Sequence, residues 1–147
     1  MNLTPHFALS ELTVTKSGLP NTPGAAEIEA LRALCVAVLE PLRAHFGAPV
    51  SVHSGYRSPA VNAATFGSSK TSQHQRGEAV DIHVVGVDCG TVARWIRDSG
   101  LPFDQVIAET RNGKEPYTWV HVSHRADGKN RGQALRTVDG VHYAPLG

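Results

Sequence analysis

Residues 79–84 alternate in the way that is typical of a half-buried strand with an acid and an imidazole on its free face. The apolar side chains at positions 80, 82 and 84 would pack on a core, whereas Asp81 and His83 would lie on the other side. Acids are uncommon inside strands unless a partner compensates their charge. The chain must therefore fold so that something binds or neutralises Asp81.

A second alternating run, residues 119–123, places His121 between two core-facing valines. His74 precedes Asp81 by seven residues, across Gly77, which allows a tight turn before the strand. If the two strands are neighbours, His74, Asp81 and His121 can meet. Zinc binds imidazole nitrogen and carboxylate oxygen, and a catalytic zinc site keeps one position open. Taken alone, these residues fit a metal site and a structural polar network equally well.

The composition is that of an ordinary globular protein. Of the 147 residues, 41% are hydrophobic and 18% are charged, which predicts one domain, residues 1–147, with a core of its own. The net charge of +1 gives no electrostatic basis for binding nucleic acid or an anionic membrane. Two cysteines, Cys35 and Cys89, make neither a disulfide framework nor a thiolate zinc site.

The chain has no apolar run that approaches the ~18 residues of a membrane span. Its N-terminus also lacks a basic segment followed by an apolar one. We therefore expect a monomer that is made in the cytoplasm without a signal peptide and does not insert into a membrane.

The remaining pattern predicts helices and strands around the two alternating runs. Apolar spacings of three and four predict a long helix that begins at Thr22 and Pro23, restarts at Pro41 and ends at Gly47. Further helices are predicted at residues 60–65, 89–99 and 130–136, a loop at 66–71, and strands at 50–53, 103–109 and 141–143. We predict a single α+β domain, with a mainly antiparallel sheet packed against helices and the metal site on the sheet face opposite the core.

The metal-binding pattern also resembles that of a known family. Peptidase family M15 comprises zinc D-alanyl-D-alanine carboxypeptidases and related peptidoglycan peptidases; many phage endolysins belong to the same superfamily, and the Hedgehog signalling domain shares the fold. The similar residues here are Ser72, His74, Gly77, Ala79 and Asp81, then His121 within residues 119–123, with further matches at 54–59 and 130–135.

The resemblance implies roles for individual residues. It implies that His74, Asp81 and His121 bind a zinc ion (Zn2+). Arg57 would contact the substrate or the developing oxyanion, because its guanidinium can bind an oxygen pair in a fork. Ser72 and Gln73 would donate hydrogen bonds to the substrate.

The water-activating base has two candidates, Glu109 and Glu115. Many relatives carry the acid three residues before the last histidine ligand, where this chain has Thr118. Glu109 would end a strand, as the family's base does, whereas Glu115 would lie beside Pro116 in a loop between strands. We therefore favour Glu109.

The resemblance predicts a zinc-dependent peptidase that hydrolyses an amide bond in peptidoglycan peptides. It would act as a D-Ala-D-Ala carboxypeptidase or as an endolysin-type endopeptidase, on the cell wall after release at lysis of a phage host. The alternatives are a non-catalytic, metal-stabilised binding or phage structural module, and a metal-free domain in which the same side chains form a polar network.

Overall fold

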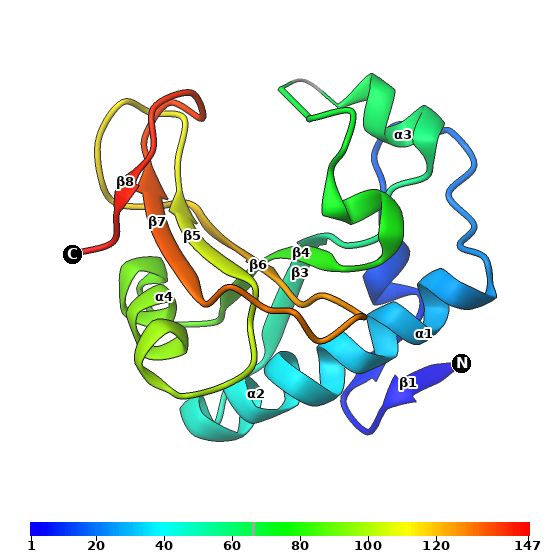
Figure 1. Cartoon of the computed structure of the whole chain (residues 1–147), viewed down its shortest axis with the longest axis horizontal. Helices are drawn as coiled ribbons and strands as arrows, with labels where there is room; N and C mark the ends of the chain where they lie inside the picture. The colour runs from blue at the N-terminus through cyan, green and yellow to red at the C-terminus, as the bar shows by residue number, and fades with distance from the viewer. Residues whose placement is uncertain (66) are drawn as a thin grey trace.

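The computed structural model describes residues 1–65 and 67–147, and a mixed sheet of six strands runs through its centre (Figure 1). The strands lie side by side in the order β3-β4-β6-β5-β7-β8, and every neighbouring pair is antiparallel except β5 and β7. Their bounds are β3 Val50–Ser54, β4 Ala79–Val84, β5 Gln105–Glu109, β6 Trp119–Ser123, β7 Gln133–Thr137 and β8 Ala144–Pro145.

The other elements surround this sheet. Figure 1 shows α4 and α2 on one side of it, and α3 at the opposite end of the molecule from β7 and β8. The elements are the hairpin β1 Asn2–Thr4 and β2 Phe7–Ala8, the 3-10 turns η1 Glu11–Thr13 and η3 Gln73–Arg76, and the helices α1 Ala25–Leu34, η2 Cys35–Leu39, α2 Glu40–Phe46, α3 Pro59–Ala64 and α4 Cys89–Asp98. The prediction of an α+β domain with a mainly antiparallel sheet is confirmed.

The long N-terminal helix contains a widened turn where the sequence predicted an interruption. Helices α1 and α2 are joined by the π-helical η2, in which the N–H of Glu40 donates to the carbonyl of Cys35. Pro41 follows directly and has no N–H to donate, so a wider turn before it accommodates the missing bond. Gly47 ends the helix in the left-handed conformation, as predicted.

The core lies between this helix, α4 and one face of the sheet. Val80, Ile82 and Val84 of β4 and Val120 and Val122 of β6 are fully buried against the helices. The alternate residues of both strands therefore point away from the core, and this second face carries the polar side chains.

Three predicted elements differ from the structure. The expected helix at residues 130–136 is the strand β7, which pairs in parallel with β5. The expected strand at 141–143 lies further on, as β8. Helix α1 begins at Ala25, because Gly24 rather than Thr22 occupies the capping position. In the loop predicted at 66–71, Phe66 lies outside the described residues.

Candidate active site

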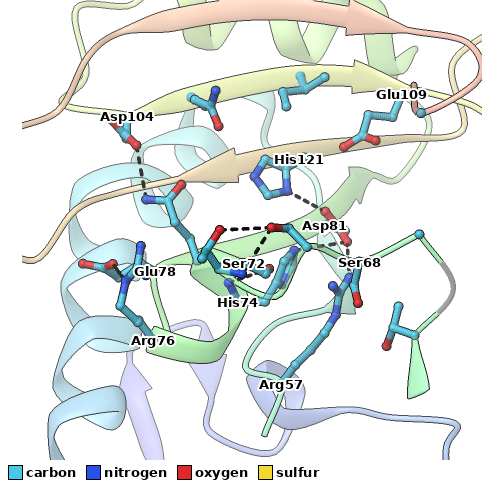
Figure 2. A pocket seen from close by; sticks show the side chains of 18 of the residues that line it. Arg57, Ser68, Ser72, His74, Arg76, Glu78, Asp81, Asp104, Glu109 and His121 are labelled. Atoms are coloured by element: carbon cyan, nitrogen blue, oxygen red, sulfur yellow. Dashed lines mark hydrogen bonds and ion pairs between the residues drawn. The ribbon is translucent and has the colours of Figure 1, made fainter. Parts of the chain in front are cut away.

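The three predicted metal ligands lie together on the free face of the sheet. Asp81 of β4 lies directly opposite His121 of β6, and His74 reaches them from η3 (Figure 2). Each offers one ligand atom, and these atoms all lie within 4.8 Å of one another. Cross-strand pairing and one short 3-10 turn thus bring together residues that are up to 47 positions apart in the sequence.

The chain around His74 fixes the orientation of its ring. Ser72 caps η3, since its Oγ accepts from the backbone N–H of His74 at 3.2 Å. The Nδ1–H of His74 donates to the carbonyl of Gly55 at 2.7 Å, which leaves Nε2 facing the Asp81 carboxylate, 3.5 Å away. Backbone acceptors hold metal-binding histidines in this manner, so the ring is ready to offer Nε2 to an ion.

Gly77 in the motif has a steric cause. It ends η3 with φ +71°, and a Cβ at this position would lie 2.5 Å from the carbonyl oxygen of Glu27 in α1. Gly55 is equally confined, because its Cβ would collide with the carbonyl of Leu12. Both glycines allow backbone segments to approach closely around His74.

The carboxylate of Asp81 is surrounded by cationic and donor groups. Its Oδ1 accepts from His121 Nδ1 at 3.0 Å, and its Oδ2 accepts from Arg57 at 3.2 Å. Burial alone would raise the pKa of Asp81, but the charge of His74 and the hydrogen bond from His121 outweigh it and hold this pKa well below its usual range. Asp81 is therefore a carboxylate at neutral pH.

His121 shows the reciprocal effect. Burial works to lower its pKa, but the hydrogen bond to Asp81 and the charges of Asp81 and Glu109 raise it above the ordinary histidine value. The carboxylates of Asp81 and Glu109 thus favour a positive charge at the His121 ring.

Glu109 ends β5 on the same face as the metal group. Ile107 lies opposite His121 in the β5–β6 pair, so Glu109, two residues on, also points to this side (Figure 2). Its side chain is buried, and Arg111 donates to it at 3.1 Å. Burial raises the pKa of Glu109, assisted by the charge of Asp81 and opposed by His121 and Arg111.

Glu115, the alternative base, occupies a different place. It is exposed in the segment between β5 and β6, whereas Glu109 lines the cleft described below. A base must come within hydrogen-bond reach of the proton that it accepts. This placement favours Glu109 over Glu115.

A cleft of about 1530 Å³ lies over the metal group. Arg57 lines it, buried to 13% exposure and held by a bond from Nε to Ser54 Oγ at 3.0 Å. Ser72 and Gln73 line it as well, but each already has a structural bond: Ser72 caps η3, and Gln73 donates to Asp104 at 3.2 Å.

His53 and His83 pair with each other and not with the metal group. His53 Nε2 and His83 Nδ1 are 2.7 Å apart, at a bulge in the β3–β4 pairing. Neither lines the cleft nor joins the ligand group in the described part of the chain. Of the eight histidines, His74 and His121 are thus the two that the fold brings to Asp81.

Two features of the cleft were missed by sequence reasoning. Arg111 contacts Glu109 and lies over the ring of Trp119, 5.0 Å from its centroid. Asp104 is fully buried and accepts two bonds from the guanidinium of Arg131, at 2.9 and 2.8 Å. For the Arg111 contacts, the one signal in the sequence is the alternation that places Trp119 on the same side of the strand as His121. The pair of Asp104 and Arg131 joins residues 27 positions apart, in segments with no shared pattern.

The donor set fits a zinc ion. Two imidazole nitrogens and one carboxylate oxygen converge, one imidazole is oriented by a backbone carbonyl, and a further carboxylate lies nearby. Three protein ligands leave a position for water or substrate, which is the arrangement of catalytic rather than structural zinc sites.

Comparison with known proteins identifies one family. A family model described as Peptidase M15 matches residues 5–123, a stretch that contains all three candidate ligands, Arg57 and Glu109. A search of curated proteins found no match to the chain. Among the residues that the structure describes, no helix is long and apolar enough to cross a membrane.

Proposed function

The chain belongs to the Peptidase M15 family, and from this premise we propose that it hydrolyses an amide bond in cell-wall peptide with the help of a zinc ion. Family membership makes it a metallopeptidase with a peptide substrate. The proposal adds the metal, the residues that bind it and the peptidoglycan origin of the peptide. The observation that carries it is the convergence of His74, Asp81 and His121 beside a buried glutamate.

The three converging side chains would hold the metal. A bound zinc ion supplies Lewis-acid polarisation of the scissile carbonyl and of a water molecule. The positions of His74 Nε2 and of the Asp81 carboxylate are fixed before any ion arrives, by Gly55 on one side and by His121 and Arg57 on the other. Such preorganisation lowers the cost of binding.

Glu109 serves as the general base. It accepts a proton from the attacking water and passes it to the nitrogen of the leaving amine, while the C–N bond breaks and a C–O bond forms. The pKa of Glu109 is raised above the ordinary glutamate value, which brings it closer to neutral pH. A group with such a pKa can both accept a proton from water and donate it to the leaving amine.

Arg57 stabilises the negative charge that develops on the carbonyl oxygen. Its guanidinium lies beside Asp81 at the floor of the cleft, and its Nε is tied to Ser54. Ser72 and Gln73 are proposed to contact the substrate from the cleft wall, in addition to their structural bonds. The location of Glu109 in the cleft supports a catalytic function over a non-catalytic, metal-stabilised module.

The test combines metal analysis with hydrolysis of purified peptidoglycan. Wild-type protein is expected to bind one zinc ion and to release peptide fragments, and His121→Ala is expected to lose both properties. His83→Ala is the matched control, because His83 lies two residues after Asp81 on the same face of β4 but outside the ligand group. An active wild-type protein that contains no metal would contradict the proposal.

The endolysin role is part of the same proposal and has its own test. Co-expression with a membrane-perforating protein is expected to lyse a bacterial culture, because the enzyme then reaches the cell wall. A His74→Ala variant should not lyse the culture under the same conditions. Equal survival with both proteins would exclude the lysis role and leave the peptidase activity untouched.

A further inference from the structure

We infer that the enzyme is an endopeptidase, whose cleft holds a peptide chain on both sides of the bond that it cuts. The inference rests on the proposed function and chooses between the two bond types that it leaves open. A carboxypeptidase needs a cleft that ends near the metal group, with a free cation to hold the terminal carboxylate. Neither feature is present among the cleft residues that the structure describes.

The cleft continues past the metal group on both sides of His121. Strand β6 runs along the floor, with Trp119 on one side of His121 and the segment from Arg125 to Asp127 on the other; both ends line the same cleft. At about 3.3 Å per residue, each end lies several ångströms beyond the ligand histidine. A peptide bound over His121 therefore meets walls in both directions.

Both ends of the cleft contain residues outside the family match at 5–123. Arg125, Ala126, Asp127 and Arg131 line one end, and the segment from Asp139 to Tyr143 lines the other. Figure 1 shows this C-terminal loop, in red, beside β5 and β7. Residues on the C-terminal side of the matched stretch therefore complete both ends of the cleft.

The cleft also offers no unpaired arginine to a terminal carboxylate in the part of the chain that the structure describes. All five arginines that line it are already paired with a carboxylate that lines it too. The pairs are Arg57–Asp81, Arg76–Glu78, Arg111–Glu109, Arg125–Asp127 and Arg131–Asp104. A substrate carboxylate bound to one of these arginines would lie beside the acidic partner of that arginine, which repels it, whereas an internal amide carries no charge.

Arg111 is the cation beside Glu109 and Trp119, and other groups hold its guanidinium from several sides. Its guanidinium donates to Glu109, lies over the ring of Trp119, and packs so closely on Gly140 that a Cβ there would collide with it. Since Glu109 passes its proton to the leaving nitrogen, the leaving segment lies at the Trp119 end. The acyl segment then lies at the Arg125–Asp127 end.

The first experiment uses a synthetic stem pentapeptide that ends in D-Ala-D-Ala, as the free acid and as the C-terminal amide, and a cross-linked stem dimer. The full zinc-loaded chain is incubated with each, and mass spectrometry identifies the products. We expect cleavage at an internal bond, with kcat/KM values for acid and amide within about twofold of each other.

Two outcomes would overturn the inference and differ in what they leave standing. Release of the terminal D-Ala alone, abolished by amidation, would identify a carboxypeptidase and leave the proposed amide hydrolysis intact. A wild-type protein that cleaves none of the three substrates would overturn the proposed function itself, and the inference with it.

A second experiment tests the two ends with a matched pair of variants, Tyr143→Ala and Asp127→Ala. Both side chains are exposed, so the fold should tolerate their loss. Tyr143→Ala is expected to raise KM roughly threefold or more only for peptides that extend beyond the first leaving residue, and Asp127→Ala only for peptides extended on the acyl side. A variant that leaves KM unchanged for every substrate would show that its end holds no peptide, and would overturn the two-sided cleft.

Discussion

The Glu109 carboxyl is buried near the negative charge of Asp81 and the positive charge of Arg111. Its removal tests whether it is the general base. The Glu109→Gln variant keeps the shape and removes the base, so kcat should fall by about 10²- to 10⁴-fold. Zinc content should stay at the wild-type level, because Glu109 is not one of the three converging ligands. Steady-state kinetics and metal analysis of the same preparation measure both quantities.

Glu115→Gln is the matched control for this prediction. Glu115 is exposed between β5 and β6 and does not line the cleft, so kcat should change little. If Glu115→Gln reduced kcat as strongly as Glu109→Gln, the base would have been assigned to the wrong acid.

The turn η3 depends on the closeness of Gly77 to helix α1. The Gly77→Ala variant combines a positive φ with a Cβ that meets the carbonyl of Glu27, and should lower the free energy of unfolding by about 2–4 kcal/mol. Gly86 also has a positive φ, +79°, but nothing lies within 4 Å of its Cβ position. Gly86→Ala should therefore cost only about 1 kcal/mol.

Urea unfolding of both variants, in the presence of a chelator, measures this difference. Zinc affinity should fall in Gly77→Ala alone, because η3 carries His74. Equal destabilisation by the two substitutions would mean that the contact with α1 contributes nothing.

The buried Asp104 accepts hydrogen bonds from the exposed Arg131, and these bonds connect the segment before β7 to the start of β5. Hydrogen bonds from Arg131 lower the pKa of Asp104 from its ordinary 3.8 to about 2, although burial opposes the shift. Because the pKa of Asp104 is lower in the folded than in the unfolded state, its ionised form stabilises the fold at any pH above the unfolded-state pKa. This contribution is lost as the pH falls from about 4 through about 2. It amounts to about 2 kcal/mol.

The prediction is a convergence of wild type and Asp104→Asn at acid pH. The gap between their unfolding free energies should shrink by about 2 kcal/mol between pH 5 and pH 2. Arg131→Gln should weaken the same pH dependence, because Asp104 then loses the side-chain donor that lowers its pKa most. Parallel curves for wild type and Asp104→Asn over this range would contradict the assignment.

The strand β7 shows where sequence reasoning stops. The run from Gln133 to Arg136 consists of good helix formers, and its local pattern predicted a helix. In the structure, Gly132 turns the chain with φ +64° and the bonds between Arg131 and Asp104 direct the next residues beside β5. Pairing with β5, a parallel strand distant in the sequence, overrides the local preference of these residues for a helix. The residues around position 133 carry no signal of that pairing.

The runs around Asp81 and His121 were predictable for the opposite reason. Their period of two survives in the folded chain because one face packs on the core, and core packing fixes the register that sets Asp81 opposite His121. The partners of the site that come from irregular segments, such as Arg111 and Tyr143, have no period and could not be placed in advance.

For the whole molecule, the three ligands join η3 to the sheet, so metal binding should stabilise the entire fold. An ion at 100 times its dissociation constant adds about 2.7 kcal/mol, which for a chain of this size raises the Tm by about 5–10 °C. Calorimetry with zinc and with a chelator should show this shift in wild type and in His53→Ala, whose ring lies outside the ligand group. His121→Ala should abolish it. A wild-type Tm that is the same with and without metal would mean that His74, Asp81 and His121 form only a polar network.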